Sequence, residues 1–210
     1  MAGQVITIAQ RKGGAGKTTL AAQLAVAWIK TGARVALLDI DPQASLAAWA
    51  GLRRERLGAA NIGFEFAALP GWRAEQWIGE HARAADFVII DSPPQVETEA
   101  RIAVRAAALV LVPVQPSPLD LWATEATLAM AKNERRPALA VLNRVPPRSS
   151  ATERIAAALG QLGVAVATGR IGNRVALVQA MAQGLGVLET AAASPAAAEI
   201  AALAAELRHR

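Results

Sequence analysis

Short apolar runs alternate along this chain with longer segments in which apolar and polar residues recur at helical spacing. The apolar runs are rich in Val, Ile and Leu and carry almost no charge, which is typical of strands buried on both faces of a parallel sheet. The predicted strands are Val5–Ala9, Val35–Asp39, Phe87–Asp91, Leu109–Val114 and Leu139–Asn143, with weaker ones near Gly63–Ala67 and Val164–Thr168.

Helices are expected between these strands, where the spacing of apolar residues changes to a helical period. Such alternation predicts an α/β fold, with one mostly parallel, twisted sheet, helices on both faces and ligands at the carboxyl ends of the strands. No repeat or linker interrupts the pattern, so we expect residues 1–210 to form one domain. The predicted helices lie near Lys17–Thr31, Ser45–Gly51, Arg73–Arg83, Leu119–Asn133, Ala151–Leu162 and Arg174–Gln183.

A final helix is predicted after Ser194, which is suited to cap it, and Pro195, which is suited to open it. Ile200, Leu203 and Leu207 would form one narrow apolar stripe. Such a stripe either packs against the sheet or lies on a membrane surface. We favour packing, because a membrane helix needs bulky apolar residues opposite a basic face.

A glycine-rich segment, RKGGAGKTT at residues 11–19, connects the first strand to the first helix. Glycines in this position let backbone N–H groups close around phosphate oxygens, and the helix N-terminus adds partial positive charge. Lys17 would reach the β- and γ-phosphates, and the Thr18 hydroxyl would bind Mg²⁺. Arg11 replaces the usual first glycine, and an extra lysine, Lys12, precedes the glycine pair. The predicted nucleotide-binding residues of this loop are Gly13, Gly14, Ala15, Gly16, Lys17, Thr18 and Thr19.

Two further strands end in carboxylates, as nucleotide chemistry requires. Asp39 ends one strand and is followed by Asp41, and Asp91 ends another. A carboxylate after a run of apolar strand residues holds Mg²⁺ directly or through water in phosphate-loop enzymes. Each segment alone also fits a strand that ends in a capping aspartate, but their joint occurrence with the glycine-rich loop favours a triphosphate and Mg²⁺ site.

Composition narrows the class of protein. The 210 residues are 53% hydrophobic and include no cysteine, so disulfides and thiolate metal sites are excluded. No apolar run approaches the length of a membrane span. The net charge of +5 is concentrated in one stretch, where eight cations face two carboxylates. That excess either attracts a polyanion or covers solvated helix faces. Its cations are Lys132, Arg135, Arg136, Arg144, Arg148, Arg154, Arg170 and Arg174.

These motifs together resemble the ParA/MinD family of deviant-Walker P-loop ATPases, and most of all the small ParA proteins that partition plasmids and position cargo. The matching pieces come in the family's order and span nearly the whole chain. The first strand begins so early that we expect no N-terminal DNA-binding domain. The matching pieces are KGGAGKTT at 12–19, DIDPQ at 39–43, DSPP at 91–94 and VPVQPSPLD at 112–120.

The resemblance implies a role for each site residue. Lys17 and Thr18 would bind phosphate and Mg²⁺ within one subunit, whereas Lys12 would reach the partner's phosphates across an ATP-sandwich homodimer. Asp41 would orient or activate the attacking water, with Asp39 and Asp91 organising Mg²⁺. Asn143 is a candidate adenine reader, because its amide offers a donor and an acceptor; a plain turn residue at a strand end is the alternative.

The same resemblance implies a function. The protein would be an intrinsically slow, Mg²⁺-dependent ATPase that cycles between ATP and ADP and dimerises with ATP. The dimer would bind nucleoid DNA without sequence preference, and a ParB/ParG-like or cargo-adaptor protein would stimulate hydrolysis. We therefore expect a cytoplasmic, nucleoid-associated protein that segregates or positions cargo. The expected phosphate contacts are Arg144, Arg148, Arg154, Arg170 and Arg174.

Two alternatives belong to other classes. A MinD-like positioning ATPase would bind anionic membranes through the residues after Ser194, which the weak apolar stripe of the last helix disfavours. A metabolic or metal-cluster-carrier P-loop enzyme would need cysteine thiolates or a substrate pocket. The chain contains no cysteine, and its sequence indicates no such pocket.

Overall fold

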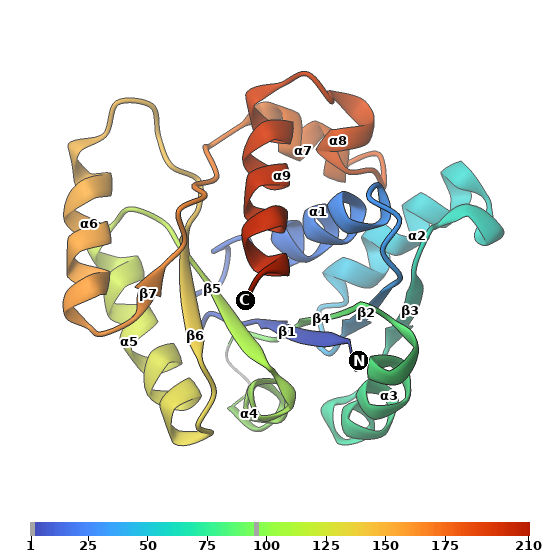
Figure 1. The fold of residues 1–210 in the computed structure, drawn as a ribbon, viewed down its shortest axis with the longest axis horizontal. Coiled ribbons are helices and arrows are strands. Elements are labelled where there is room, and N and C mark those ends of the chain that lie inside the picture. The colour runs from blue at the N-terminus through green and yellow to red at the C-terminus, as the bar shows by residue number, and fades with distance from the viewer. Residues whose placement is uncertain (1–2, 95–96) are drawn as a thin grey trace.

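The computed structural model describes residues 3–94 and 97–210 (Figure 1). Seven strands in these residues form one parallel sheet in the order β3-β2-β4-β1-β5-β6-β7. Every strand is parallel to its neighbours, so each connection must cross back over a face of the sheet. The strands are β1 Gln4–Ile8, β2 Val35–Asp39, β3 Glu65–Ala68, β4 Phe87–Asp91, β5 Leu109–Val114, β6 Ala138–Leu142 and β7 Ala165–Val166.

Helices supply these crossovers and cover both faces of the sheet (Figure 1). The helices are α1 Lys17–Ile29, α2 Ser45–Leu57, α3 Gly71–Ala84, α4 Glu97–Ala106, α5 Pro118–Asn133, α6 Ser150–Gln161, α7 Val175–Met181, α8 Val187–Thr190 and α9 Pro195–Arg208, with a short 3₁₀ turn at Ala59–Asn61.

The core is divided by the sheet because successive side chains of a strand point to opposite faces. On one face, Ile6, Leu37 and Ile89 pack under α1, α2 and the C-terminal helices. On the other face, the alternate residues of the same strands pack under α3 to α6; Val88 and Val112 are examples. The continuous apolar runs of the sequence therefore reflect burial on both sides.

Strand register decides where the polar residues at the strand ends lie. Ile8, the last residue of β1, is level with Asp91 of β4, and Asp39 of β2 is level with Asp91 on its other side. Because all strands are parallel, the glycine-rich segment and both carboxylates emerge at the same edge of the sheet. β1 lies at the point where the order of strands reverses, which is where ligands bind in such sheets.

Most predicted elements are confirmed. β2, β4 and β5 have the expected bounds, and β1, β6 and α1 differ from the prediction by one or two residues at their ends. Helix α2 runs six residues past the predicted Gly51, to Leu57. Helix α4 was not predicted, because its buried face is made largely of alanines, which give a weak apolar signal.

Helix α9 begins as predicted, with the Ser194 side chain accepting a hydrogen bond from the backbone N–H of Ala197. Its stripe of Ile200, Leu203 and Leu207 is fully buried. The helix packs chiefly against α1 rather than directly on the sheet, and the indole of Trp28 donates to the backbone carbonyl of Ala204. In the described part of the chain, no helix is long and apolar enough to span a membrane.

Candidate active site

The glycine-rich loop adopts a conformation that its glycines make possible. Gly14 and Gly16 have left-handed backbone angles, with φ of 73° and 95°. Residues that carry a side chain rarely adopt such backbone angles. A Cβ at Gly16 would lie 2.3 Å from the amide nitrogen of Asn143. The predicted loop is therefore a compact turn that ends in the N-terminus of α1, as a phosphate cradle requires.

Two amide side chains hold this loop from outside. Asn143 donates a 2.8 Å hydrogen bond to the carbonyl of Ala15, and Gln115 donates a 3.0 Å bond to that of Gly14. Asn143 is buried and directly follows the last residue of β6, so β6 fixes its position. Its clearest role here is to support the loop, and contact with adenine stays a prediction.

Lys17 opens α1 and points back under the loop. Its ammonium group is buried and donates to the carbonyl of Gln10 at 3.2 Å. Burial lowers the pKa of Lys17 below its usual range, although the carboxylates of Asp91 and Asp41 oppose that shift. An ammonium group carries three donors, so Lys17 keeps capacity to bind phosphate oxygens beside the loop.

Thr18 and Asp91 meet at the predicted metal position. The Thr18 hydroxyl donates a 2.6 Å hydrogen bond to one carboxylate oxygen of Asp91. The other oxygen, Oδ1, is buried without a partner among the described residues. Burial raises the pKa of Asp91 to about 7, against the hydrogen bond from Thr18. An orphaned carboxylate oxygen beside a hydroxyl is a donor set that suits Mg²⁺, which prefers oxygen ligands.

Asp39 and Asp41 form a second pair. Asp39 is buried, and its two oxygens accept the backbone N–H groups of Asp41 at 3.0 Å and Ala47 at 2.9 Å. It thereby caps α2, whose N-cap residue, Ala44, has no polar side chain. Asp39 thus holds the segment that presents Asp41; its contact with Mg²⁺ stays a prediction.

A cavity of about 600 Å³ opens above the loop. Its polar wall includes Lys17, Thr18 and Asp41, and its apolar wall includes Leu52 and Val178. The volume suits a small-molecule ligand such as a nucleotide. The apolar wall could not be predicted from the sequence, because α2 and α7 come together there only in the fold.

Lys12 does not line this cavity. Its ammonium group forms a 2.6 Å ion pair with Asp120, which lies in the first turn of α5 and is 1% exposed. Ser117, the N-cap of α5, donates its hydroxyl to the same oxygen of Asp120. The segment around Asp120 matched the family pattern, but no role for that carboxylate was predicted.

A buried polar network connects the same helix to the start of the loop. The Gln10 amide donates to the Thr124 hydroxyl at 2.9 Å and accepts from the Thr127 hydroxyl at 3.1 Å. Thr127 also accepts the backbone N–H of Arg11. These residues were not predicted, since a lone glutamine after a strand carries no recognisable pattern. The network makes α5 a direct support of the loop.

The five arginines predicted to contact DNA are in different settings. Arg144 borders the nucleotide cavity. Arg170 is paired with Glu153, and Arg174 is paired with Glu199 at 2.6 Å. Glu199 lies outside the stretch over which charge was counted, so the folded surface is less basic there than the sequence indicates.

Comparison with known families tests the resemblance. Residues 6–187 match the model of a family described as the CobQ/CobB/MinD/ParA nucleotide binding domain. The chain belongs to this family. The match contains the loop, both strand-end carboxylates, Asp120 and Asn143, so the site described above lies within the family's own nucleotide-binding region.

ParA/MinD-type proteins are prominent among the matches. Maintenance of carboxysome distribution protein A of Halothiobacillus neapolitanus is 30% identical over 201 residues, which cover 92% of this chain and 91% of that protein. The cell division ATPase MinD of Pyrococcus furiosus shares the fold, with a TM-score of 0.82 at 24% identity over 99% of both chains. A Cyanothece McdA–ATP complex has a TM-score of 0.78 at 19% identity, over 98% of this chain and 95% of the other.

Proposed function

We propose that this protein is an ATP-dependent dimerising switch that segregates or positions a plasmid, a chromosome or another intracellular cargo. The observation that carries the proposal is that two lysines of one loop occupy different settings. Lys17 is buried and lines the nucleotide cavity, whereas Lys12 is not part of its lining and pairs with Asp120. A lysine that serves the bound nucleotide and another that serves a partner's nucleotide are what the family resemblance requires.

The chemistry of the cavity supports ATP hydrolysis. Thr18 and Asp91 would hold Mg²⁺. Asp39 would support the Mg²⁺ site through its hydrogen bond to the backbone N–H of Asp41, in the segment that leads into α2. Mg²⁺ bound there neutralises negative charge that develops on the phosphates. Asp41 lines the cavity and would orient the attacking water. In-line attack depends on positioning more than on a strong base, so unstimulated turnover is slow.

Dimerisation would complete the site. Lys12 of each protomer would leave Asp120 and bind the partner's phosphates, where it neutralises charge as an arginine finger does. Nucleotide occupancy would then dictate pairing. A partner of the ParB/ParG or cargo-adaptor kind would stimulate hydrolysis and so dissociate the dimer. The name of the carboxysome-distribution relative supports a positioning role.

The ATP dimer would bind nucleoid DNA without sequence preference. Arg148 and Arg154 are exposed, and neither forms an ion pair within the described residues. They are therefore better candidates for phosphate contacts than Arg170, which is paired. The logarithm of DNA affinity should fall with the logarithm of salt concentration, by about 0.9 for each phosphate neutralised. Replacing Arg148 and Arg154 with alanine should flatten that slope, and Arg170→Ala should change it less.

Membrane positioning receives no support from α9. The only bulky apolar stripe of that helix is buried against the protein, so it would have to leave the core before it could enter a bilayer. The proposed location is the nucleoid in the cytoplasm.

The two lysines provide the test. Lys17→Ala should abolish ATP binding, because the nucleotide loses its buried cation. Lys12→Ala should still bind ATP as a monomer but should lose ATP-induced dimerisation and stimulated turnover. Nucleotide binding is measured by calorimetry and dimerisation by light scattering with ADP and ATP. If Lys12→Ala dimerises with ATP as the wild type does, the proposed switch is wrong.

A further inference from the structure

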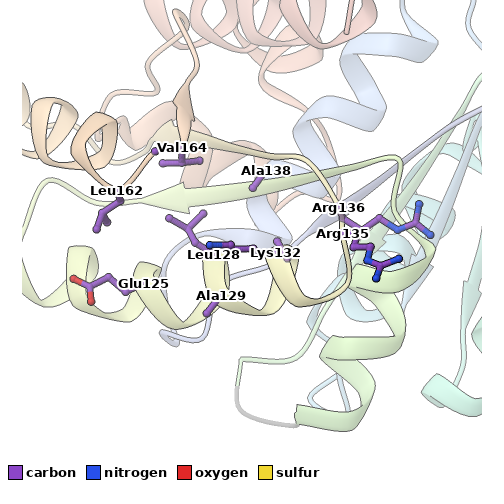
Figure 2. Close-up of a pocket in the computed structure, with 11 residues that line it drawn as sticks. Glu125, Leu128, Ala129, Lys132, Arg135, Arg136, Ala138, Leu162 and Val164 are labelled. Carbon is purple, nitrogen blue, oxygen red and sulfur yellow. The ribbon is translucent and has the colours of Figure 1, made fainter.

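A second cavity, of about 610 Å³, lies beside the C-terminal half of α5 (Figure 2). Its other walls are the start of β6 at Ala138 and the connection that leads into β7, at Leu162 and Val164. The strands are parallel, so the amino ends of β6 and β7 are at the opposite edge of the sheet from the phosphate loop. We call this cavity the α5 groove. It is separate from the nucleotide site.

The floor of the α5 groove is apolar. Leu128, Ala138 and Val164 line it, and Val164 is 8% exposed. Leu162 stands at its edge with 41% of its surface exposed. Figure 2 shows Leu128, Leu162 and Val164 grouped on one side of the groove. Together with the apolar floor, Leu162 offers a continuous apolar area that a ligand can cover.

One end of the groove is strongly basic. Lys132, Arg135 and Arg136 line it, all three are exposed, and none forms an ion pair within the described residues. The carboxylate between them in sequence, Glu134, faces α4 instead, where it binds Arg101 and Arg105. Glu134 therefore does not neutralise these cations. The carboxylate in the groove's own lining, Glu125, lies about 10 Å along α5 from Lys132, so the three cations remain available to a ligand.

The backbone at Arg135 adds an independent observation. Arg135 follows the end of α5 with φ of 55°, a left-handed angle that costs energy for any residue with a side chain. On the opposite wall, Gly163 has φ of 75°, and glycine adopts that angle easily. The chain thus places an arginine at the mouth of the groove, where a glycine would adopt the same backbone angle at lower conformational energy.

The groove is elongated along α5. Glu125, Leu128 and Lys132 are separated by three and four residues, so they share one face of the helix over two turns, about 10 Å. A trough of that length beside a helix fits the apolar face of a second helix, which inserts side chains at the same spacing. A nucleic-acid backbone makes its contacts mainly through phosphate and sugar oxygens, so it would leave the apolar floor uncovered.

We propose that the α5 groove docks an acidic amphipathic helix of a partner protein. Apolar side chains of that helix cover Leu128 and Leu162, and its carboxylates pair with Lys132, Arg135 and Arg136. Docking at this edge of the sheet leaves the nucleotide cavity open, so the partner binds whether or not nucleotide is present. The proposal does not depend on the ATPase switch.

A display library of helix-forming peptides of about 14 residues tests the proposal. The full-length protein selects from the library, and a Lys132→Glu, Arg136→Glu variant removes peptides that do not need the groove. Enriched peptides should combine Asp and Glu with Leu, Ile or Met at helical spacing. A fluorescently labelled peptide from the enriched set should bind the charge-reversed variant at least about tenfold more weakly, as measured by fluorescence anisotropy. The reason is that the attraction of its carboxylates to Lys132 and Arg136 becomes repulsion.

Three further variants make the result specific. Arg54→Glu with Arg56→Glu reverses two exposed cations in the last turn of α2, and it should change peptide affinity by less than about twofold. Leu162→Ser removes apolar area from an exposed position, so it should weaken binding without lowering the unfolding temperature. Arg135→Gly removes charge while relieving the backbone, so it should weaken binding in a protein that is at least as stable.

The proposal is overturned if the selection yields no peptide that prefers the wild type to the charge-reversed variant. It is equally overturned if the enriched peptides carry no excess of acid. Duplex DNA or dodecyl phosphate that displaces a winning peptide stoichiometrically would assign the groove to nucleic acid or to a small amphiphile, and would also refute it.

Discussion

The ammonium group of Lys12 lies 2.6 Å from the carboxylate of Asp120, and this contact joins the phosphate loop to the first turn of α5. The two partners are unequal, since 35% of the lysine side chain is exposed but only 1% of the aspartate. The other oxygen of Asp120 is buried without a partner in the described residues. Releasing Lys12 therefore leaves a buried charge with less compensation, which opposes any movement of the lysine toward a partner's phosphates.

Asp120→Asn should make ATP-dependent dimerisation easier. The amide retains the shape of the side chain and can still accept the hydroxyl of Ser117, but it no longer holds the ammonium group electrostatically. An ion pair with one partner this exposed is worth about 1 kcal/mol. Each protomer releases one such pair, so the dimer dissociation constant with ATP should fall roughly thirtyfold, as measured by analytical ultracentrifugation. Glu125→Gln on the same helix is the matched control. Weaker dimerisation of Asp120→Asn would contradict the proposed restraint of Lys12 by Asp120.

Asp41→Ala should retain ATP and accumulate the dimer. The residue lines the cavity but does not hold the loop, so its removal leaves nucleotide binding in place. Loss of the group that orients water should lower turnover about a hundredfold. Phosphate release and light scattering measure the two effects. If the variant dimerised no better than the wild type, the role given to Asp41 would be withdrawn.

The network between Gln10 and α5 should contribute to stability. Thr127→Val removes the hydroxyl that contacts Gln10 and the backbone of Arg11, and it leaves both groups unsatisfied. The expected cost is about 1–3 kcal/mol. For a chain of this size, each kcal/mol lowers the melting temperature by roughly 2–4 °C, which calorimetry resolves.

Thr152→Val is the matched control for that experiment. Thr152 is also buried, yet its hydroxyl has no partner among the described residues. Removing an unsatisfied hydroxyl is neutral or stabilising. Equal melting temperatures for the two valine variants would show that the Gln10 network adds nothing.

Acid should weaken the packing of α4 on α5 through Glu134. Arg105 and Arg101 lower the pKa of this carboxyl to about 2. A depressed pKa contributes stability that is present above the unfolded value, near 4.5, and is lost as the pH falls toward 2. Glu134→Gln should therefore flatten the pH dependence of unfolding in that window. An Arg101→Gln, Arg105→Gln variant should flatten it similarly, and an unchanged profile in both would exclude the linkage.

Much of the site was readable from local sequence because parallel strands share an edge. An apolar run that ends in Asp39 or Asp91, and another that leads into the glycine-rich loop, are patterns within a few residues. Once each is recognised as a strand, its last residue must lie at the same edge as the others. The cap of α9 at Ser194 was predictable for the same reason, since a cap involves only adjacent residues.

Pairings between distant residues were not readable in this way. Lys12 and Asp120 are 108 residues apart, and Gln10 and Thr124 are 114 apart. Which carboxylate meets Lys12 depends on β5 lying beside β1, so that α5 begins next to the loop. Glu199 likewise meets Arg174 only because α9 returns close to the start of α7.

The sequence by itself determined that this chain makes a parallel sheet, where its phosphate loop lies and which carboxylates accompany it, because strand period, glycine conformation and capping act over short spans. Only the tertiary structure decided that Lys12 is held by Asp120, that α5 supports the loop at one end and lines a basic groove at the other, and which arginines keep their charge uncompensated. Those features depend on strand order and helix packing, which bring together residues that no local pattern connects.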